Sequence, residues 1–250
     1  MAFRKQVTNH PFDPGKPMIE VVDLYKAFGD KEVLKGVSFE VYAGETLGII
    51  GPSGCGKSTI LKHLCDLLPW DSGRIIKQSD DIGLVFQASA LLNSLTVREN
   101  LALALRNRRL DRSAQNSIIT EKLQLVGLTE YIDAYPTELS GGQQKRTSFA
   151  RAIVNDPKII LYDEPTTGLD PVMSTIIEDY MMTLEQKLGA ASIVVTHQYS
   201  TWSRTADRVM LLHDGKMLWE GKPQDALSSD NPYINQFAHA TRQGPITIAI

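Results

Sequence analysis

The chain has 250 residues, of which 42% are hydrophobic and 22% charged, a composition typical of a globular protein with one large core. A net charge of −3 argues against a chain-wide basic field for nucleic acid, and no apolar run reaches the length that spans a bilayer. The two cysteines, Cys55 and Cys65, are poorly placed to bridge each other, which predicts free thiols in a reducing compartment.

Residues 1–17 contain three prolines and a glycine and lack the apolar core of a secretory signal, so we expect a flexible arm. The next segments are β-rich in pattern. We expect strands at 18–24, 33–42, 46–50, 74–77 and 82–86.

Residues 51–59 read GPSGCGKST and match the phosphate-binding loop pattern. They stand between an apolar strand segment and a helical pattern in which Ile60, Leu61, Leu64 and Leu68 share a face. The glycines let the backbone turn so that free N–H groups converge on one anion at a helix N-terminus. Lys57 adds a charge for the β- and γ-phosphates, and the Ser58 hydroxyl can ligate Mg²⁺. The pattern predicts nucleotide binding by Gly51, Ser53, Gly54, Cys55, Gly56, Lys57, Ser58 and Thr59.

Residues 97–155 are mostly helical in pattern, and residues 139–146 within them read LSGGQQKR. Ser140 is a good N-cap residue, and Gly141 and Gly142 expose backbone N–H groups before a helix from Gln143 to about Val154. This arrangement predicts a second anion site. The alternative is a glycine-rich loop that caps an ordinary helix.

An apolar run over residues 159–163 ends in Asp163 and is followed by Glu164. A buried parallel strand would bring both acids to the sheet edge that carries the phosphate loop. Asp163 is suited to hold Mg²⁺ through water, and Glu164 to take a proton from an attacking water. These are parts that hydrolysis of a terminal phosphate needs.

The chain then alternates between a helical pattern over 176–188, a strand at 192–196, a short helix, and a hairpin-like pair at 208–213 and 216–220. This alternation predicts an α/β core with a parallel sheet. His197 follows the strand and is aimed at the same edge as Asp163, where an imidazole can contact the γ-phosphate. The tail at 229–250 offers an apolar helical face (Tyr233, Ile234, Phe237) and a strand-like alternation at 246–250. It could pack on its own subunit or reach across to a partner.

Together these stretches resemble the ATP-binding cassette (ABC) ATPases over about residues 18–228. GPSGCGKST resembles the Walker A loop, LSGGQ (139–143) the family signature, and ILYDEP (160–165) Walker B with its catalytic glutamate. The resemblance implies a P-loop NTPase core with a parallel sheet, an N-terminal antiparallel β region and a helical signature subdomain at about 88–155.

The resemblance also implies roles for single residues. It implies ATP and Mg²⁺ as cofactors, with catalytic roles for Glu164, His197, Gln87 and Lys57, and metal ligation by Ser58, Gln87 and Asp163. Phe28 matches the aromatic that stacks on adenine, and Tyr25 is a weaker candidate for that role. The remaining nucleotide contacts would come from Ser140, Gly141, Gly142, Gln143 and the D-loop residue Asp170.

Each chain has one Walker A loop and one signature, and in this family the signature binds the nucleotide held by the other subunit. A head-to-tail homodimer is therefore implied. Also implied are permease subunits docked after Gln87, near residues 90–92 and 95–100, and a peripheral position on the cytoplasmic face of the inner or plasma membrane, or on the stromal face in a plastid.

Four stretches, 144–146, 168–181, 213–223 and 231–246, resemble the ATPases of Mla-type systems, which move phospholipids with a permease and an MCE-domain partner. Only thirty residues separate Lys57 from Gln87, fewer than is usual in the family, so we expect a trimmed antiparallel β region. One alternative is the ATPase of an importer for a small polar solute. Another is a non-transport cassette protein acting on nucleic acid or a scaffold. The net negative charge and the lack of zinc-type cysteine pairs argue against nucleic-acid binding. The sequence contains no NKxD-type guanine-binding motif, which argues against a GTPase.

Overall fold

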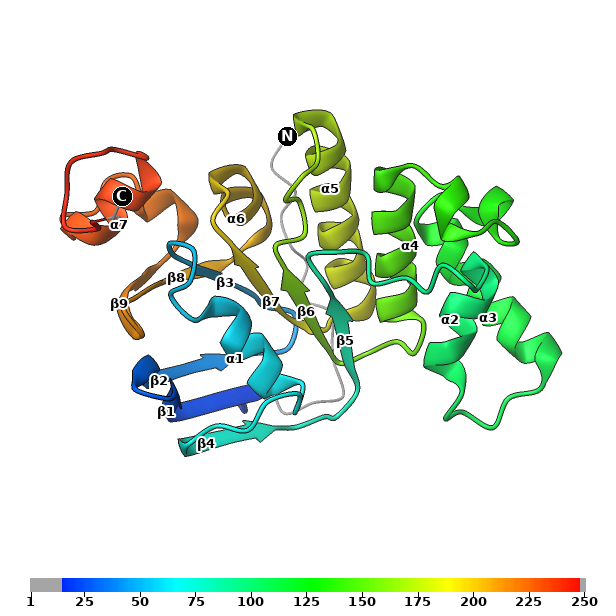
Figure 1. The fold of residues 1–250 in the computed structure, drawn as a ribbon, viewed down its shortest axis with the longest axis horizontal. Helices are drawn as coiled ribbons and strands as arrows, with labels where there is room; N and C mark the ends of the chain where they lie inside the picture. Colours follow the sequence, from blue (N-terminus) through cyan, green and yellow to red (C-terminus); the bar gives the residue numbers. More distant parts are fainter. Residues whose placement is uncertain (1–14, 248–250) are drawn as a thin grey trace.

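The computed structural model describes residues 15–247. Figure 1 shows a small sheet and a larger sheet with one helix, α1, between them, and a group of helices on one flank. Most of the expected N-terminal arm, residues 1–14, lies outside the described residues, as do residues 248–250.

The larger sheet has six strands in the order β5-β6-β7-β3-β8-β9. All neighbouring pairs are parallel except β8 and β9. This arrangement confirms the predicted α/β core. The strands are β3 (Thr46–Ile50), β5 (Ile82–Val85), β6 (Ile159–Asp163), β7 (Ala191–Thr196), β8 (Arg208–His213) and β9 (Lys216–Gly221).

The central strands are mostly apolar and almost entirely buried because both faces of this sheet are covered. In β6, Ile159 and Leu161 pack into the core that contains α1 and the small sheet. Ile160 and Tyr162 point to the other face, into the core formed with the flanking helices. The sheet is therefore fixed from both sides, which holds its strand ends in place.

The small sheet is antiparallel, with the order β2-β1-β4, and confirms the predicted N-terminal β region. Its strands are β1 (Ile19–Phe28), β2 (Lys31–Val41) and β4 (Ser72–Lys77). From β4 the chain reaches β5 through residues 78–81 alone, which accounts for the short spacing between the phosphate loop and Gln87.

Helix α1 (Lys57–Leu64) starts at the phosphate loop and buries Ile60, Leu61 and Leu64. The prediction that Leu68 continues this helical face is wrong. The helix ends at Leu64 because the chain turns at Asp66, whose φ of 56° is left-handed.

The flanking helices are α2 (Val97–Leu105), α3 (Arg112–Leu125) and α4 (Gly141–Ile153), joined by the 3-10 turns Thr129–Tyr131 and Pro136–Glu138. Together with α5 (Pro171–Leu188) they form the second core. Figure 1 shows this group beside β5 and β6.

Helix α6 (Tyr199–Thr205) follows β7, and α7 (Pro232–Ala238) comes after the 3-10 turn Pro223–Asp225. The apolar face expected in the tail is present in α7, where Ile234 is fully buried with Trp202 and Leu211 of the same chain. The described tail thus packs on its own subunit. The strand-like pattern expected at 246–250 is wrong for its described part, because Ile246 lies outside any strand and its N–H donates to Oε1 of Gln236 at 2.7 Å.

Candidate functional site

A cleft of about 360 Å³ collects most of the residues predicted for nucleotide chemistry. They come from the end of β1, the loop before α1 and the first turn of α1, and the loops after β5, β6 and β7. Parallel strands end at one edge of a sheet, so segments far apart in sequence meet there. The lining residues are Phe28, Val33, Ser53, Gly54, Gly56, Lys57, Ser58, Thr59, Gln87, Glu164 and His197.

The loop before α1 requires glycine at two positions. A Cβ on Gly51 would stand 2.1 Å from the carbonyl oxygen of Leu212, and one on Gly56 would stand 2.8 Å from Leu34 Cδ2. Both residues have positive φ, 147° and 113°. The loop thereby leads straight into α1, whose N-terminal N–H groups face the cleft.

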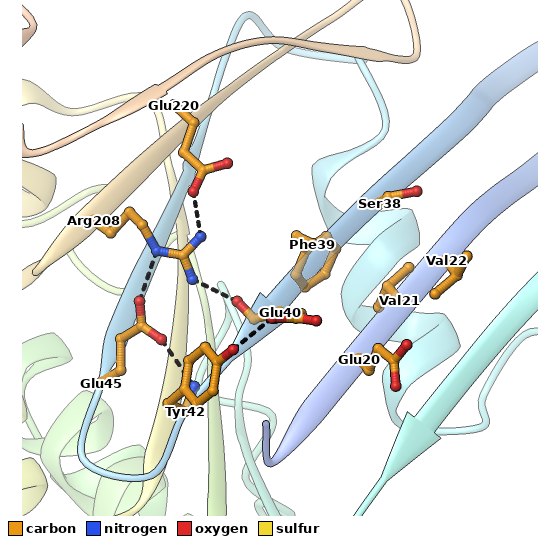
Figure 2. Close-up of a pocket in the computed structure, with 10 residues that line it drawn as sticks. All are labelled: Glu20, Val21, Val22, Ser38, Phe39, Glu40, Tyr42, Glu45, Arg208 and Glu220. Atoms are coloured by element: carbon orange, nitrogen blue, oxygen red, sulfur yellow. Dashed lines mark hydrogen bonds and ion pairs between the residues drawn. The ribbon is translucent and has the colours of Figure 1, made fainter. Parts of the chain in front are cut away.

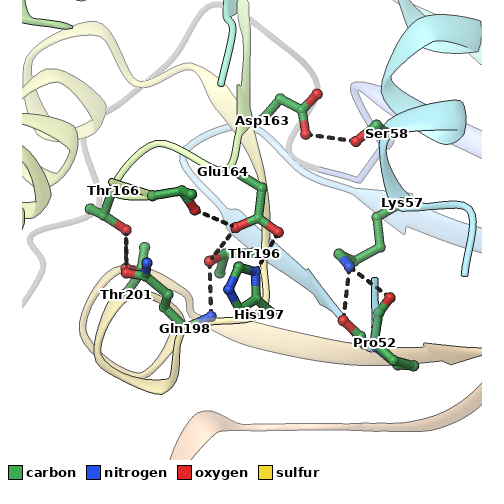
Figure 3. A network of polar contacts seen from close by, with 12 residues as sticks. Pro52, Lys57, Ser58, Asp163, Glu164, Thr166, Thr196, His197, Gln198 and Thr201 are labelled. Carbon is green, nitrogen blue, oxygen red and sulfur yellow. Dashed lines mark hydrogen bonds and ion pairs between the residues drawn. The ribbon is translucent and has the colours of Figure 1, made fainter. Parts of the chain in front are cut away.

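Lys57 is 6% exposed and folds over this loop. Its Nζ donates to the carbonyl oxygens of Gly51, at 2.8 Å, and Pro52, at 3.0 Å (Figure 3). A phosphate bound by the loop would replace these weak acceptors with a charged one, so the ammonium group is already at the anion site.

Cys55 belongs to the same loop but does not line the cleft. Burial raises the pKa of its thiol, which keeps it protonated at neutral pH. The structure therefore favours a packing role for Cys55. Both cysteines are free, as expected.

Asp163 does not itself line the cleft but contacts a residue that does, because Ser58 Oγ donates to Asp163 Oδ1 at 2.8 Å. Burial raises the pKa of Asp163, and the hydrogen bond from Ser58 opposes this rise. Two oxygen donors at this distance, with Gln87 in the same cleft, fit the few protein ligands that Mg²⁺ takes beside water and phosphate oxygens.

Glu164 points away from Asp163 because its backbone is left-handed, with a φ of 47°. A non-glycine residue held in this region carries strain, and such residues cluster at functional sites. The carboxylate accepts from Thr167 Oγ1 at 3.1 Å and Thr196 Oγ1 at 3.2 Å, and lies 2.8 Å from His197 Nδ1. Figure 3 shows the two acids diverging.

The loop that carries Gln87 is held by a residue that sequence reasoning missed. Lys145 on α4 is buried, and its Nζ donates to the carbonyl oxygens of Phe86 and Gln87 at 3.0 and 2.8 Å. Burial lowers the pKa of Lys145 to about 8. A lysine on the buried face of the helix after LSGGQ was the available signal.

Of the two aromatic candidates for a nucleotide base, the structure brings Phe28 to the cleft and not Tyr25. Phe28 ends β1 with half of its surface exposed, and Lys26 Nζ lies 5.4 Å from its ring centroid. The hydroxyl end of the Tyr25 ring lies against Gly36 on the small sheet instead.

The signature residues lie outside the cleft of their own chain. Ser140, Gly141, Gly142 and Gln143 begin α4, where Ser140 Oγ accepts from Gln143 N–H and Gln143 Oε1 from Ser140 N–H at 2.8 Å. Asp170 is likewise elsewhere, because its carboxylate caps α5 by accepting from Val172 and Met173 N–H. Within one chain, the structure therefore does not bring these residues to the predicted nucleotide site.

A larger hollow of about 540 Å³ lies away from the predicted site residues, between the small sheet and the strands β8 and β9 (Figure 2). At its centre Arg208 donates to Glu45 Oε1 at 2.8 Å and also to Glu220 and the carbonyl oxygen of Glu40. These groups satisfy one another and tie the two sheets together, so the hollow is structural.

None of the helices in residues 15–247 is long and apolar enough to cross a membrane.

The ABC transporter family matches residues 34–167 of this chain. Among curated proteins, the chain is 43% identical to "Protein TRIGALACTOSYLDIACYLGLYCEROL 3, chloroplastic" of Arabidopsis thaliana, over 92% of this chain and 75% of that protein. It is 37% identical to the spermidine/putrescine import ATP-binding protein PotA of Pasteurella multocida, over 84% of this chain. The chain spans 60% of the length of that second relative.

A solved structure of an ATP-binding cassette, described as a dimer in a post-hydrolysis state bound to ADP and Pi, superposes with a TM-score of 0.75. It is 30% identical and covers 82% of this chain and 99% of its own.

Proposed function

This chain belongs to the ABC transporter family of ATP-hydrolysing subunits, and we propose that it drives phospholipid transport with a permease and an MCE-domain protein as partners. The similarity that carries this proposal is the 43% identity over 92% of the chain to a protein named after a galactolipid. The assignments of ATP binding and ATP hydrolysis rest on the residues of the cleft.

ATP binding is assigned to the phosphate loop and Phe28. Backbone N–H groups of the loop and of the first turn of α1 would hold the phosphates, with Lys57 supplying the countercharge. The exposed ring of Phe28, at the rim of the cleft, would stack on adenine. Ser58 and Asp163, with Gln87, would hold Mg²⁺, which neutralises charge on the phosphates when bound.

Hydrolysis is assigned to Glu164 as the group that accepts a proton from the attacking water. Its two threonine donors and the His197 imidazole fix the carboxylate in the cleft, and its 8% exposure limits access of bulk water. His197 lines the same cleft, so its imidazole can contact the terminal phosphate.

Members of this family dimerise, and the matching solved cassette is a dimer. We infer a head-to-tail homodimer in which residues 140–143 and Asp170 of one copy complete the cleft of the other. The position of these residues outside their own cleft supports this inference. The site is then closed only while ATP bridges the two copies.

A second candidate function, the ATPase of an importer for a small polar solute, is favoured by the 37% identity to a spermidine/putrescine import subunit. The two functions share all chemistry of the cleft and differ in the membrane partner. In both, we place the protein at the inner face of a membrane, cytoplasmic or stromal, as a peripheral subunit.

The surface that we assign to the permease follows Gln87. It displays the apolar side chain of Leu92, which is 50% exposed, and is flanked by Phe86, just before Gln87, which is 37% exposed. Arg151 donates to the carbonyl oxygens of Ala90, at 2.7 Å, and Ser89, so this segment is held on α4 rather than free. A held loop with apolar side chains outward is suited to dock a membrane subunit.

The test is affinity purification of the tagged full chain from native membranes, with mass spectrometry of the proteins and lipids that co-purify. A permease, an MCE-domain protein and bound phospholipid support the proposal. A periplasmic solute-binding protein in their place would contradict it and support the importer.

Matched variants make the same test site-specific. Leu92→Asp should lose the co-purifying permease while keeping ATPase activity, because Leu92 lies outside the cleft. Leu227→Asp places the same charge on another exposed leucine, 40% exposed, and should keep the permease.

A further inference from the structure

A row of polar side chains runs from the cleft into the contact between α5 and α6. Figure 3 shows three of its members, Gln198, Thr166 and Thr201. Thr166, in the loop after Glu164, lies 2.8 Å from Gln198 Oε1 and 2.7 Å from Thr201 Oγ1. Thr201, on α6, donates to Glu178 Oε1 on α5 at 3.0 Å. Thr166 and Thr201 are fully buried, so water cannot replace these contacts.

Glu178 is the charged end of this row and has no part in the cleft. Its side chain is 1% exposed, and Arg204 Nε of α6 lies 3.2 Å from its other carboxylate oxygen. Burial raises the pKa of Glu178, and Thr201 and Arg204 oppose this rise. A buried ion pair is weak evidence for stability, since well-packed apolar residues in place of both partners often serve as well. The pair therefore calls for another explanation.

The row has too few hydrogens for its contacts. Three contacts join Gln198, Thr166, Thr201 and Glu178, but the two hydroxyl groups bring two hydrogens, and both ends of the row are acceptor oxygens. The third hydrogen must come from an end, either a proton on Glu178 or the amide NH₂ of Gln198 turned toward Thr166. The orientation of the Gln198 amide is thus linked to the charge at Glu178.

At its other end the row reaches the hydrolytic residues. Gln198 follows His197 directly, and its N–H donates to Thr196 Oγ1 at 3.1 Å. Thr196 Oγ1 in turn donates to Glu164 Oε2 at 3.2 Å. A shift of Gln198 would therefore move the His197 loop and one of the donors that hold the Glu164 carboxylate.

We propose that Thr201 and Glu178 are positioning residues for ATP hydrolysis, which hold Gln198, and through it His197 and Thr196, in register with Glu164. This inference rests on the assignment of Glu164 and His197 made above. It does not depend on what the transporter carries. The row of polar side chains contacts neither the phosphate loop nor Phe28, so we expect it to affect turnover and not ATP binding.

The test measures kcat and KM for ATP of the purified full chain with Mg²⁺. Thr201→Val keeps the shape of the side chain but removes the hydroxyl, and so leaves Thr166 and Glu178 without their shared partner. We expect kcat to fall at least about tenfold with KM within about twofold, since small misplacements of catalytic groups are costly in rate. Thr201→Ser restores the hydroxyl and should return kcat to within about threefold of the wild type.

The matched control is Thr205→Val, one turn along α6. Thr205 is also buried and its hydroxyl donates to the carbonyl oxygen of Thr201 at 2.7 Å, outside the row. Its kcat should stay near that of the wild type. Equal kcat for Thr201→Val and Thr205→Val, or a loss confined to KM, would overturn the proposal.

Glu178→Leu gives a second reading that does not depend on Thr201. A merely structural ion pair predicts a loss of stability with unchanged kcat of the folded protein, whereas the positioning role predicts the same loss of kcat as for Thr201→Val. Glu185→Leu, at another buried glutamate of α5 that does not line the cleft, is its control. A Glu164→Gln arm separates the two claims: full activity there would refute the assignment of Glu164 itself, whatever Thr201 does.

Discussion

The replacement of Glu164 with glutamine removes a charge and a proton acceptor but keeps the size of the side chain. Glu164 is 8% exposed, and its carboxylate has three partners within 3.2 Å, Thr167, Thr196 and His197. An amide oxygen still accepts from both threonines, and the amide NH₂ can donate to Nδ1 of a neutral imidazole. The cleft should therefore keep its shape in Glu164→Gln.

The expected effects of Glu164→Gln on turnover and on stability differ widely in size. Loss of a general base reduces turnover by about 10²–10⁴-fold. The contacts that glutamine retains change from charged to neutral acceptors, which alters the free energy of unfolding by about 1 kcal/mol. For a chain of this size that is a shift of about 2–4 °C in Tm. The variant should thus be folded, bind ATP and fail to hydrolyse it.

Phosphate release gives kcat, a thermal scan gives Tm, and light scattering in ATP and Mg²⁺ gives the mass. We expect Glu164→Gln to accumulate as a dimer in ATP, because the bridging nucleotide is no longer consumed. A kcat within tenfold of the wild type, or a monomer in saturating ATP and Mg²⁺, would refute the reasoning.

Three other predictions concern stability and reactivity. Ile234→Ala, in α7, should cost about 2–5 kcal/mol in urea denaturation and leave kcat unchanged, because the fully buried Ile234 does not line the cleft; an unaltered midpoint would contradict this. Burial raises the pKa of Cys65 to about 11 from 9.0, so its thiolate fraction at pH 8 should be about a hundredfold lower. Alkylation followed by mass spectrometry should therefore show Cys65 reacting much more slowly in the native than in the denatured protein. Equal rates would count against the burial of Cys65. Gly51→Ala should lower Tm far more than Gly141→Ala, since a Cβ at Gly51 meets a backbone oxygen at 2.1 Å and one at Gly141 meets nothing within 4 Å. Similar melting temperatures for the two variants would disprove the close contact at Gly51.

The phosphate loop and the sheet could be predicted from the sequence because both depend on local chemistry. Gly51 and Gly56 occupy positions where a side chain would clash, and β6 is apolar up to its final Asp163 because both of its faces are buried. The common edge of parallel strands then places Glu164 and His197 beside Lys57 without further information.

What the sequence did not reveal depends on contacts between distant segments. Lys145 reads as a surface lysine until α4 is packed against the Gln87 loop, about sixty residues away in the chain. Glu178 likewise reads as one polar position of a helix until Thr201 of α6 meets it. The end of α1 was missed for a local reason, because the left-handed turn at Asp66 outweighs the helical spacing of Leu68.

The central claim is that the phosphate loop of one copy and the signature loop of another make one site, and a mixing experiment tests it most directly. Lys57→Ala disables the first loop. Gly141→Asp places a carboxylate in the first turn of α4, where it would repel a phosphate although its Cβ meets nothing within 4 Å in its own chain.

Each variant alone should be inactive. In an equal mixture about half of the dimers are mixed, and each mixed dimer has one intact site of two, so we predict about a quarter of the wild-type ATPase rate. A mixture as inactive as the separate variants would contradict a site shared between two copies.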